Sequence, residues 1–315
     1  SEVFTLPLEQ PEMTAGQECF LTVRFKLARR TIWGEAGHEV AFEQFKMPYA
    51  AMLPAPVLPD RGAIKPQFTA TERKLSLGKM ALDFDAAENF MTFGAEKLLL
   101  NPPELNIWRG PTDNDGIKAF TLKFKQKHKA LHKWHDMKLW DVVRREAEMS
   151  AFPADEEYAI LNEAFYAAPE SDAGIRWNAM WRLGRDGAIH LASEFEVPQE
   201  LADLPRLGLM LELPAEFTNI RYFGRGPQEN QSDRDAGYPI GLYDTTVDEM
   251  HVPYIMPQEN GNRTAVRYAA IANAAGTGLL VTAPETMEFS VSRFSAEELY
   301  KKMHEYELTP SDRIY

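Results

Sequence analysis

The chain has 315 residues, 44% of them apolar, and a formal net charge of −13. This length and apolar content suffice for a substantial core, and all-β domains often run to about 200–250 residues, so we expect one large domain and a smaller piece. The acidic balance, without a basic stripe, excludes a nucleic-acid partner, because binding to phosphates requires clustered lysines and arginines.

Signals for a membrane or for secretion do not occur in the sequence. No apolar run approaches the roughly 18 residues that a spanning helix needs, and residues 1–5 lack the basic start of a signal peptide. The single cysteine, Cys19, rules out an intrachain disulfide and fits a reducing compartment. We therefore expect a cytoplasmic protein with no membrane partner. The chain does not begin with Met, so we expect a piece excised from a longer polypeptide.

The first part of the chain is predicted to hold two strands. Residues 20–27 alternate in polarity, with Leu21, Val23 and Phe25 on one face, which is typical of a half-buried strand. A second strand is expected at residues 40–45. Five prolines then indicate an extended connector that cannot join a sheet interior, namely Pro48, Pro54, Pro56, Pro59 and Pro66.

We accordingly divide the chain into a first piece at residues 1–47, a linker at 48–73 and a large domain at 74–315. Two helices are expected in the large domain, one at residues 121–135 and one at 295–302, where Ser295 can cap the helix and Glu298 follows three residues later. Many short strands with long loops predict an all-β fold, a large antiparallel β-sandwich. The predicted strands of this domain are residues 74–84, 89–100, 158–167, 175–183, 188–197, 207–213, 220–223, 267–273, 279–282 and 288–293.

Three loops framed by Gly and Pro are the candidate functional segments, at residues 108–116, 223–234 and 253–261. Each combines carboxylates and amides, and aromatic residues or arginines accompany them. Sugar hydroxyls need fixed donors and acceptors, while the apolar face of a sugar needs an aromatic ring or a flat guanidinium. This composition therefore predicts a carbohydrate partner.

Metal binding is not predicted. Asp113, Asn114 and Asp115 before Gly116 resemble part of an EF-hand loop, but its twelfth position would be Leu122 rather than Glu. The alternatives are that Asp113 and Asp115 shape a turn or that they act at a sugar site. A zinc site on the predicted helix, formed by His128, His132 and His135, is disfavoured by the surrounding lysines, which indicate a solvated basic face.

Glu229 and Glu259 each follow Pro-Gln and precede Asn, and two interpretations are open for them. They could be the acid and nucleophile of a glycosidase, which requires carboxyl groups about 5 Å apart for retention or about 6.5–9.5 Å for inversion. They could instead pair with the nearby arginines Arg225, Arg234 or Arg263 and brace the loops. Trp177 and Trp181 share one face of a predicted strand, and we expect them in the core.

Five motifs, in order along most of the chain, resemble the C-terminal part of the β-galactosidases of glycoside hydrolase family 2. They are residues 35–45, 108–115, 224–230, 253–263 and 289–295. The resemblance implies a large sandwich of the galactose-mutarotase-like type from about residue 74 onward, truncated at its C-terminus. It implies that residues 1–47 are the last strands of an immunoglobulin-like bridging domain.

Enzymes of this family are retaining glycosidases whose two catalytic Glu residues lie in a barrel upstream of this segment. The resemblance therefore implies that this chain holds no catalytic residue and is inactive alone, which favours the ion-pair interpretation of Glu229 and Glu259. It implies no metal or other cofactor bound by this chain, with Mg²⁺ and Na⁺ held through the barrel. The implied partners are the rest of the β-galactosidase polypeptide, a β-galactoside substrate and further copies in a homo-oligomer.

The resemblance also indicates which residues lie at the carbohydrate site or its interface. A loop that lies near the active-site mouth in relatives, and that can move, corresponds to Gly116, Ile117 and Lys118, where Gly116 supplies backbone freedom. The other candidates are Trp108, Arg109, Asp113, Asn114, Asp115, Arg225, Glu229, Asn230, Glu259 and Asn260.

Three other functions remain open at the level of sequence. The chain could be a free-standing carbohydrate-binding module, with saturable sugar binding at the loops. It could be a mutarotase-like sugar epimerase, which uses a His with a carboxylate as acid and base, and His251 near Glu249 is the candidate pair. A purely structural role predicts no sugar binding. The exact β-glycoside preferred by the parent enzyme is not encoded in these motifs.

Overall fold

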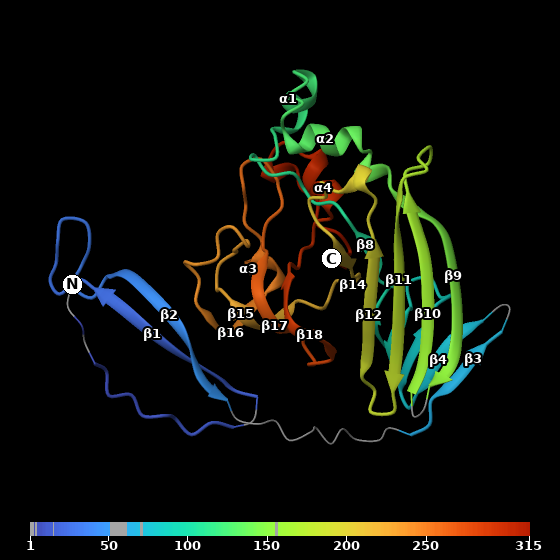
Figure 1. The fold of residues 1–315 in the computed structure, drawn as a ribbon, viewed down its shortest axis with the longest axis horizontal. Coiled ribbons are helices and arrows are strands. Elements are labelled where there is room, and N and C mark those ends of the chain that lie inside the picture. Colours follow the sequence, from blue (N-terminus) through green and yellow to red (C-terminus); the bar gives the residue numbers. More distant parts are fainter. Residues whose placement is uncertain (1–2, 4, 15, 51–61, 70–71, 155–156) are drawn as a thin grey trace.

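The computed structural model describes residues 3, 5–14, 16–50, 62–69, 72–154 and 157–315, and it is an all-β protein (Figure 1). Every strand pairing within the described part is antiparallel. The prediction of an antiparallel β-sandwich is confirmed. Among the described residues, no helix is both long and apolar enough to cross a membrane.

One four-stranded sheet has the order β12-β11-β10-β9. Along β11, Trp177 and Trp181 are 1% and 6% exposed, so their predicted place in the core is confirmed. The strand β9 was not predicted, because its first half is charged and solvent-exposed on the sheet edge and shows no apolar alternation. The bounds are β9 (Val143–Ala154), β10 (Glu157–Ala167), β11 (Gly174–Gly184) and β12 (Ile189–Glu196).

A second four-stranded sheet has the order β16-β15-β17-β18. Its edge strand β16 was also missed, since Gly241, Asp244 and the threonines at its end weaken the strand pattern. The strand β18 is continuous across residues that the sequence divided between two predicted strands. The bounds are β15 (Asn219–Arg225), β16 (Ile240–Thr246), β17 (Arg263–Ala272) and β18 (Gly278–Phe289).

The predicted strands 74–84 and 89–100 are each a hairpin of two short strands. Gly78 and Gly94 stand in the two-residue turns with φ of 58° and 64°, a left-handed conformation that glycine adopts without steric cost. These strands belong to a five-stranded sheet of order β3-β4-β5-β6-β7. Its bounds are β3 (Lys65–Phe68), β4 (Arg73–Leu77), β5 (Met80–Asp83), β6 (Met91–Phe93) and β7 (Glu96–Leu99).

One continuous apolar core joins the three larger sheets. It contains Leu75 and Phe90 from the five-stranded sheet region, Trp177 from β11 and Tyr222 from β15, each 1% exposed or less. The ring of Trp181 contacts Phe90 at 5.8 Å between centroids. Two small strand pairs complete the sandwich, β8 (Glu104–Asn106) with β13 (Gly208–Met210) and β14 (Leu213–Pro214) with β19 (Arg313–Ile314).

The predicted helix at residues 121–135 is wrong in its extent, because the chain forms two helices there. Lys125 adopts φ of 48°, and the amide of Gln126 donates to Thr121 O at 2.9 Å, which ends the first helix. The predicted helix at 295–302 is confirmed, and Ser295 caps it by accepting from the Glu298 amide. The helices are α1 (Lys118–Lys123), α2 (Ala130–Asp136), α3 (Val247–Met250) and α4 (Ala296–Lys301), with single turns η1 (Leu139–Asp141), η2 (Gln199–Leu201) and η3 (Glu305–Glu307).

The two predicted strands of the first piece pair as a hairpin, β1 (Glu18–Lys26) with β2 (Glu39–Ala50). Phe25, expected on a half-buried face, is 62% exposed. The Gln44 side-chain amide exchanges two hydrogen bonds with the backbone of Ile240, at 3.0 and 2.8 Å, and so attaches the hairpin to edge strand β16. Glu18 pairs with Arg267 of β17 at 2.8 Å.

Only part of the predicted linker, residues 48–73, belongs to the described residues. Pro48 lies in β2 and Pro66 in β3, both edge strands of their sheets, where a missing amide hydrogen is tolerated. The strands therefore extend further into the predicted linker than the prolines indicated. Pro54, Pro56 and Pro59 lie outside the described residues.

Replacing Trp177 with Ala should lower the free energy of unfolding by about 3–5 kcal/mol, because a fully buried indole leaves a large cavity. The matched control is Trp33→Ala, since Trp33 is 60% exposed and its loss should change stability by less than about 0.5 kcal/mol. Urea unfolding followed by circular dichroism measures both. Equal losses would contradict the core described for β11.

Candidate functional site

The three Gly- and Pro-framed loops, far apart in sequence, are bound to one another. The first and third loops share hydrogen bonds from Glu259 N to Gly110 O at 3.0 Å and from Asp113 N to Gln258 Oε1 at 3.1 Å. The second and third loops are joined by Gly261 N donating to Glu229 Oε2 at 2.9 Å. We call this assembly, residues 108–116, 223–234 and 253–263, the three-loop cluster.

In the first loop, Asp115 is the centre of a compact turn. Its carboxylate accepts two hydrogen bonds from the Arg109 guanidinium, at 2.7 and 3.0 Å, and one from the Thr112 amide at 2.8 Å. Arg109 also lies over the Trp134 ring at 5.4 Å. Asp115 thus shapes the turn, as one of the two alternatives predicts. Asp113 and Asn114 are exposed at its tip.

Glu229 links the second loop to the third. Its carboxylate accepts from the Tyr254 hydroxyl and from the Gly261 amide, and Arg234 lies 3.4 Å from its Oε1. Of the three arginines proposed as partners, only Arg234 pairs with Glu229. Arg225 pairs instead with Asp235 at 3.2 Å.

Arg263 does not pair with either Glu, contrary to the proposed interpretation. It is 3% exposed and donates to the Tyr222 hydroxyl at 2.9 Å and to the carbonyl oxygen of Gly261 at 2.9 Å. Burial of a guanidinium requires that its donors be satisfied, and here neutral acceptors satisfy them. Arg263 therefore holds the third loop through hydrogen bonds to its carbonyl oxygens and does not form an ion pair with Glu229 or Glu259.

Glu259 pairs with Arg206, a residue that the sequence analysis did not single out. The side chain of Glu259 is 9% exposed and that of Arg206 is 25% exposed. Arg206 lies just before β13, so the two residues are 53 positions apart. No local pattern in the sequence could indicate this pairing, because only the fold brings the two segments together.

The candidate amides Asn230 and Asn260 are used within the cluster. Asn230 is fully buried, accepts from the Thr264 amide and hydroxyl at 2.9 and 2.7 Å, and donates to Arg225 O and Gln228 O. Asn260 accepts from the Val252 amide at 3.0 Å. Their side chains hold the loops and have little capacity left for a ligand.

The segment predicted to be a mobile loop leads from the turn into α1. Gly116 has φ of 139°, and a Cβ there would lie 2.6 Å from the Thr121 hydroxyl. Lys118 is 3% exposed, and its ammonium donates to the carbonyls of Leu299 and Lys302 at the end of α4, at 2.6 and 2.5 Å. Burial lowers the pKa of Lys118 to about 8. Ile117, between the two, is 43% exposed.

Trp108 belongs to an aromatic cluster between the loops and the helices. Its ring contacts Trp140 at 5.9 Å and Tyr300 of α4 at 5.4 Å. His135 Nε2 is 2.8 Å from the Tyr300 hydroxyl, and the His135 ring lies 3.6 Å from that of Trp140. Burial, with a smaller contribution from nearby His132, lowers the pKa of His135 to about 4. The cluster therefore contains a neutral imidazole at ordinary pH.

The histidines considered for other chemistry are separated by the fold. His128 lies between α1 and α2, outside both helices, so the three imidazoles do not share one helical face. Within the described ranges, no three His, Cys, Asp or Glu side chains are grouped to hold a metal ion. His251 pairs with Glu305 at 2.8 Å rather than with Glu249, which caps α3 together with Thr246.

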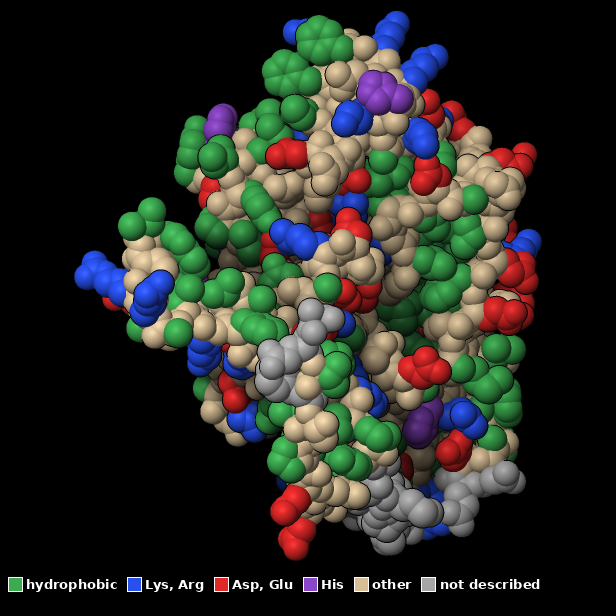
Figure 2. All heavy atoms as spheres, turned by 60° about the vertical axis from the view of Figure 1, so that its left-hand side comes forward, with side chains coloured by type: hydrophobic (Ala, Val, Ile, Leu, Met, Phe, Trp, Pro, Cys, Tyr) green, Lys and Arg blue, Asp and Glu red, His purple; other side chains and the backbone are tan. Residues whose placement is uncertain are grey.

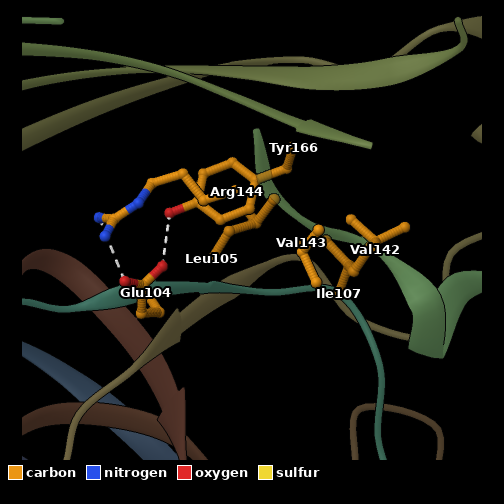
Figure 3. A pocket seen from close by; sticks show the side chains of 7 residues that line it. All are labelled: Glu104, Leu105, Ile107, Val142, Val143, Arg144 and Tyr166. Carbon is orange, nitrogen blue, oxygen red and sulfur yellow. Dashed lines mark hydrogen bonds and ion pairs between the residues drawn. The ribbon is translucent and has the colours of Figure 1, made fainter. Parts of the chain in front are cut away.

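A cavity of about 380 Å³ is lined by residues outside the three-loop cluster, and its lining residue Ile107 directly precedes Trp108 of that cluster (Figure 3). The Tyr166 hydroxyl donates to Glu104 at 2.7 Å, and Arg144 lies 3.2 Å from the same carboxylate. Burial raises the pKa of Tyr166, which keeps its hydroxyl a donor. Aliphatic side chains line the rest, Leu105, Ile107, Val142 and Val143. None of the predicted site residues faces this cavity.

Comparison with known proteins matches residues 78–315 to the family model described as the beta galactosidase small chain. The chain belongs to this family. A second model, described as beta-galactosidase domain 4, matches residues 1–48.

The relatives to which this chain is similar include proteins named beta-galactosidase from three bacteria. The one from Priestia megaterium is 29% identical in an alignment that covers 94% of this chain and 28% of that protein. The one from Vibrio cholerae is 30% identical in an alignment that covers 99% of this chain and 30% of that protein. The one from Actinobacillus pleuropneumoniae is 28% identical in an alignment that covers 98% of this chain and 29% of that protein. The chain thus spans less than a third of the length of these relatives.

The aromatic cluster should make this protein sensitive to acid. Between pH 6.5 and about 4 an unfolded His is protonated, whereas folded His135 remains neutral, so protons favour the unfolded state and stability falls as pH falls through this window. We expect His135→Gln to remove on the order of 2 kcal/mol of this pH-dependent loss.

The measurement is the urea midpoint at pH 7 and pH 4.5, for wild type, His135→Gln and the control His190→Gln. His190 is exposed on β12, and its replacement should leave the pH dependence unchanged. An unaltered pH dependence in His135→Gln would contradict the buried neutral state of this imidazole.

Proposed function

We propose that this chain is the non-catalytic C-terminal portion of a retaining β-galactosidase that hydrolyses terminal β-D-galactosides of the lactose type. Its role is to wall the substrate pocket and support the catalytic barrel. The observation that carries the proposal is the three-loop cluster, in which the carboxylates of Asp115, Glu229 and Glu259 are engaged by groups of this chain itself. Membership of the small-chain family and the names of the relatives support the assignment of the parent activity.

The geometry of the two Glu residues supports a bracing role. A retaining glycosidase needs one carboxylate that attacks the sugar and a second that donates and accepts a proton, with both reaching the same glycosidic bond. The side chains of Glu229 and Glu259 are 11% and 9% exposed. Both oxygens of Glu229 accept hydrogen bonds, and Glu259 is held by Arg206. We therefore assign the catalytic pair, and the covalent galactosyl intermediate, to the rest of the polypeptide.

The contribution of this chain to the pocket is positional. Asp113 and Asn114 project at the tip of a turn that Asp115 and Arg109 make rigid, so they are suited to hydrogen bonding with hydroxyls or with a neighbouring loop. Gly116, Ile117 and Lys118 follow at the pocket mouth, where Gly116 and Ile117 supply the adjustable part and Lys118 anchors the segment to the end of α4. In the complete enzyme, Mg²⁺ and Na⁺ belong to the barrel, and this chain binds no cofactor. We further propose a cytoplasmic homo-oligomer.

A second candidate function rests on one observation. His251 Nε2 and Glu305 are 2.8 Å apart, and His251 Nδ1 is buried without a hydrogen-bond partner in the described part of the chain. A His with a carboxylate is the acid–base pair that a mutarotase-like epimerase uses. Polarimetry of galactose anomerisation tests it, and a rate that His251→Gln abolishes would favour this candidate over the first.

The chain alone should not hydrolyse a chromogenic β-galactoside, whereas the complete enzyme should. Circular dichroism and tryptophan fluorescence establish that the tested chain is folded. Robust turnover by the chain alone that is abolished by Glu229→Gln or Glu259→Gln would overturn the proposed function, because it would locate the catalytic pair here.

Gly116→Ala should reduce kcat/KM of the complete enzyme by on the order of tenfold or more, since misplacing a pocket loop by a small distance costs rate. The new Cβ would meet the Thr121 hydroxyl at 2.6 Å, in a backbone conformation that alanine rarely adopts. The matched control is Gly237→Ala, where nothing lies within 4 Å. Similar kcat/KM values for the two variants would show that this segment does not influence the pocket.

A further inference from the structure

Two groups of large apolar side chains are exposed beside the three-loop cluster. On and before α1, Ile117, Phe120 and Phe124 are 43%, 51% and 62% exposed. In the third loop itself Ile255 is 86% exposed, and Tyr306, in a segment bonded to that loop, is 83% exposed. Figure 2 shows hydrophobic side chains at the top of the molecule, where α1 lies, with Lys and Arg side chains next to them. We call these five residues the docking face.

Each group is fixed by hydrogen bonds to a neighbouring segment of the chain. Lys118, at the start of α1, is anchored to the carbonyls at the end of α4, as described above. The segment that carries Tyr306 is bound to the third loop, because the Glu305 amide donates to Ile255 O at 3.2 Å and His251 pairs with Glu305. The exposed side chains are therefore held by the core, and their exposure does not come from a free chain end.

The phenylalanines of α1 are arranged for contact with another surface. The rings of Phe120 and Phe124 are parallel within 6° with centroids 6.0 Å apart, and the Lys123 ammonium lies 5.7 Å from the Phe124 centroid. Rigid aromatic side chains lose little conformational entropy on binding, and they dominate the energy of protein interfaces.

The surroundings of these rings are strongly basic, although the whole chain carries a net charge of −13. Asp136 is the one acidic residue among residues 118–138. Lysine stands in this segment at positions 118, 123, 125, 127, 129, 133 and 138. Lys118 is buried, and Lys133 and Lys138 pair with Asp203 and Glu170, so the positive charge that a partner meets comes from the exposed Lys123, Lys125 and Lys127. A partner that covers the rings should therefore present an apolar depression with an acidic rim, because charge complementarity steers association and excludes wrong partners.

We propose that the docking face is covered by the part of the β-galactosidase polypeptide that lies outside this chain, at an apolar surface with an acidic rim. The inference rests on the proposed function and identifies where that partner sits. Relatives are more than three times as long as the matched segment, so most of their polypeptide is available to form this surface. The docking face also adjoins the three-loop cluster, which is the proposed wall of the pocket, because Ile255 lies in the third loop and Ile117 directly follows the first.

The test is the accessibility of single cysteines in the complete enzyme, in a Cys19→Ser background that removes the one cysteine of this chain. Phe124→Cys and Ile255→Cys report the two groups of the docking face. The matched control is Leu280→Cys on β18, because the exposed fraction of Leu280, 65%, is close to the 62% of Phe124. Maleimide labelling is followed by mass spectrometry of the peptides, and each rate in the native enzyme is divided by the rate in urea.

We expect the native-to-denatured labelling ratios at positions 124 and 255 to be at least tenfold lower than at position 280. Equal ratios at all three positions in an enzyme with full galactosidase activity would overturn the inference and leave the proposed function intact. Protection that disappears on dilution while activity persists would assign the face to a second copy of this chain and would also overturn it. Absence of galactosidase activity in the complete enzyme would overturn the proposed function, and the proposed occupant with it.

Discussion

The Glu229 carboxylate is the contact on which the arrangement of the loops depends. It is largely removed from water, and a carboxylate in such a place is stable only when donors surround it. The Tyr254 hydroxyl and the Gly261 amide supply those donors from the third loop, and Arg234 supplies a charge from the second. The need to satisfy one carboxylate thus joins two segments that are distant in sequence. The third loop in turn holds the first through Glu259 and Gln258.

The sandwich provides the rigidity that this arrangement requires. Tyr222 and Val266 lie in the common core on β15 and β17, and the second and third loops adjoin the ends of these same strands. Arg263 connects this core to the third loop, because its buried guanidinium donates hydrogen bonds to the Tyr222 hydroxyl and to the loop carbonyls. The first loop is stabilised differently, through α4 and the aromatic cluster around Tyr300. The three-loop cluster is therefore stabilised from two sides, by the strands β15 and β17 and by α4 with the aromatic cluster.

Local sequence predicted much of the fold, because side-chain alternation is a property of each strand alone. The strands around Trp177 and Phe195 and the Ser295 cap follow from neighbouring residues. The edge strands β9 and β16 were missed, since an edge strand can be stabilised by its single neighbour while its own side chains stay polar. The break between α1 and α2 was missed as well, because it depends on Lys125 in a left-handed conformation that its residue type does not favour.

For the candidate site, the sequence by itself determined the chemical composition of the three loops and the family that they resemble. Only the tertiary structure decided their partners: Glu259 with Arg206, Glu229 with Tyr254, His251 with Glu305, and Lys118 with the end of α4. The physical reason is that turn formation depends on neighbouring residues, whereas a buried charge takes whichever partner the packed sheets bring within hydrogen-bonding distance. That distance is fixed by the whole core, so no local pattern encodes it.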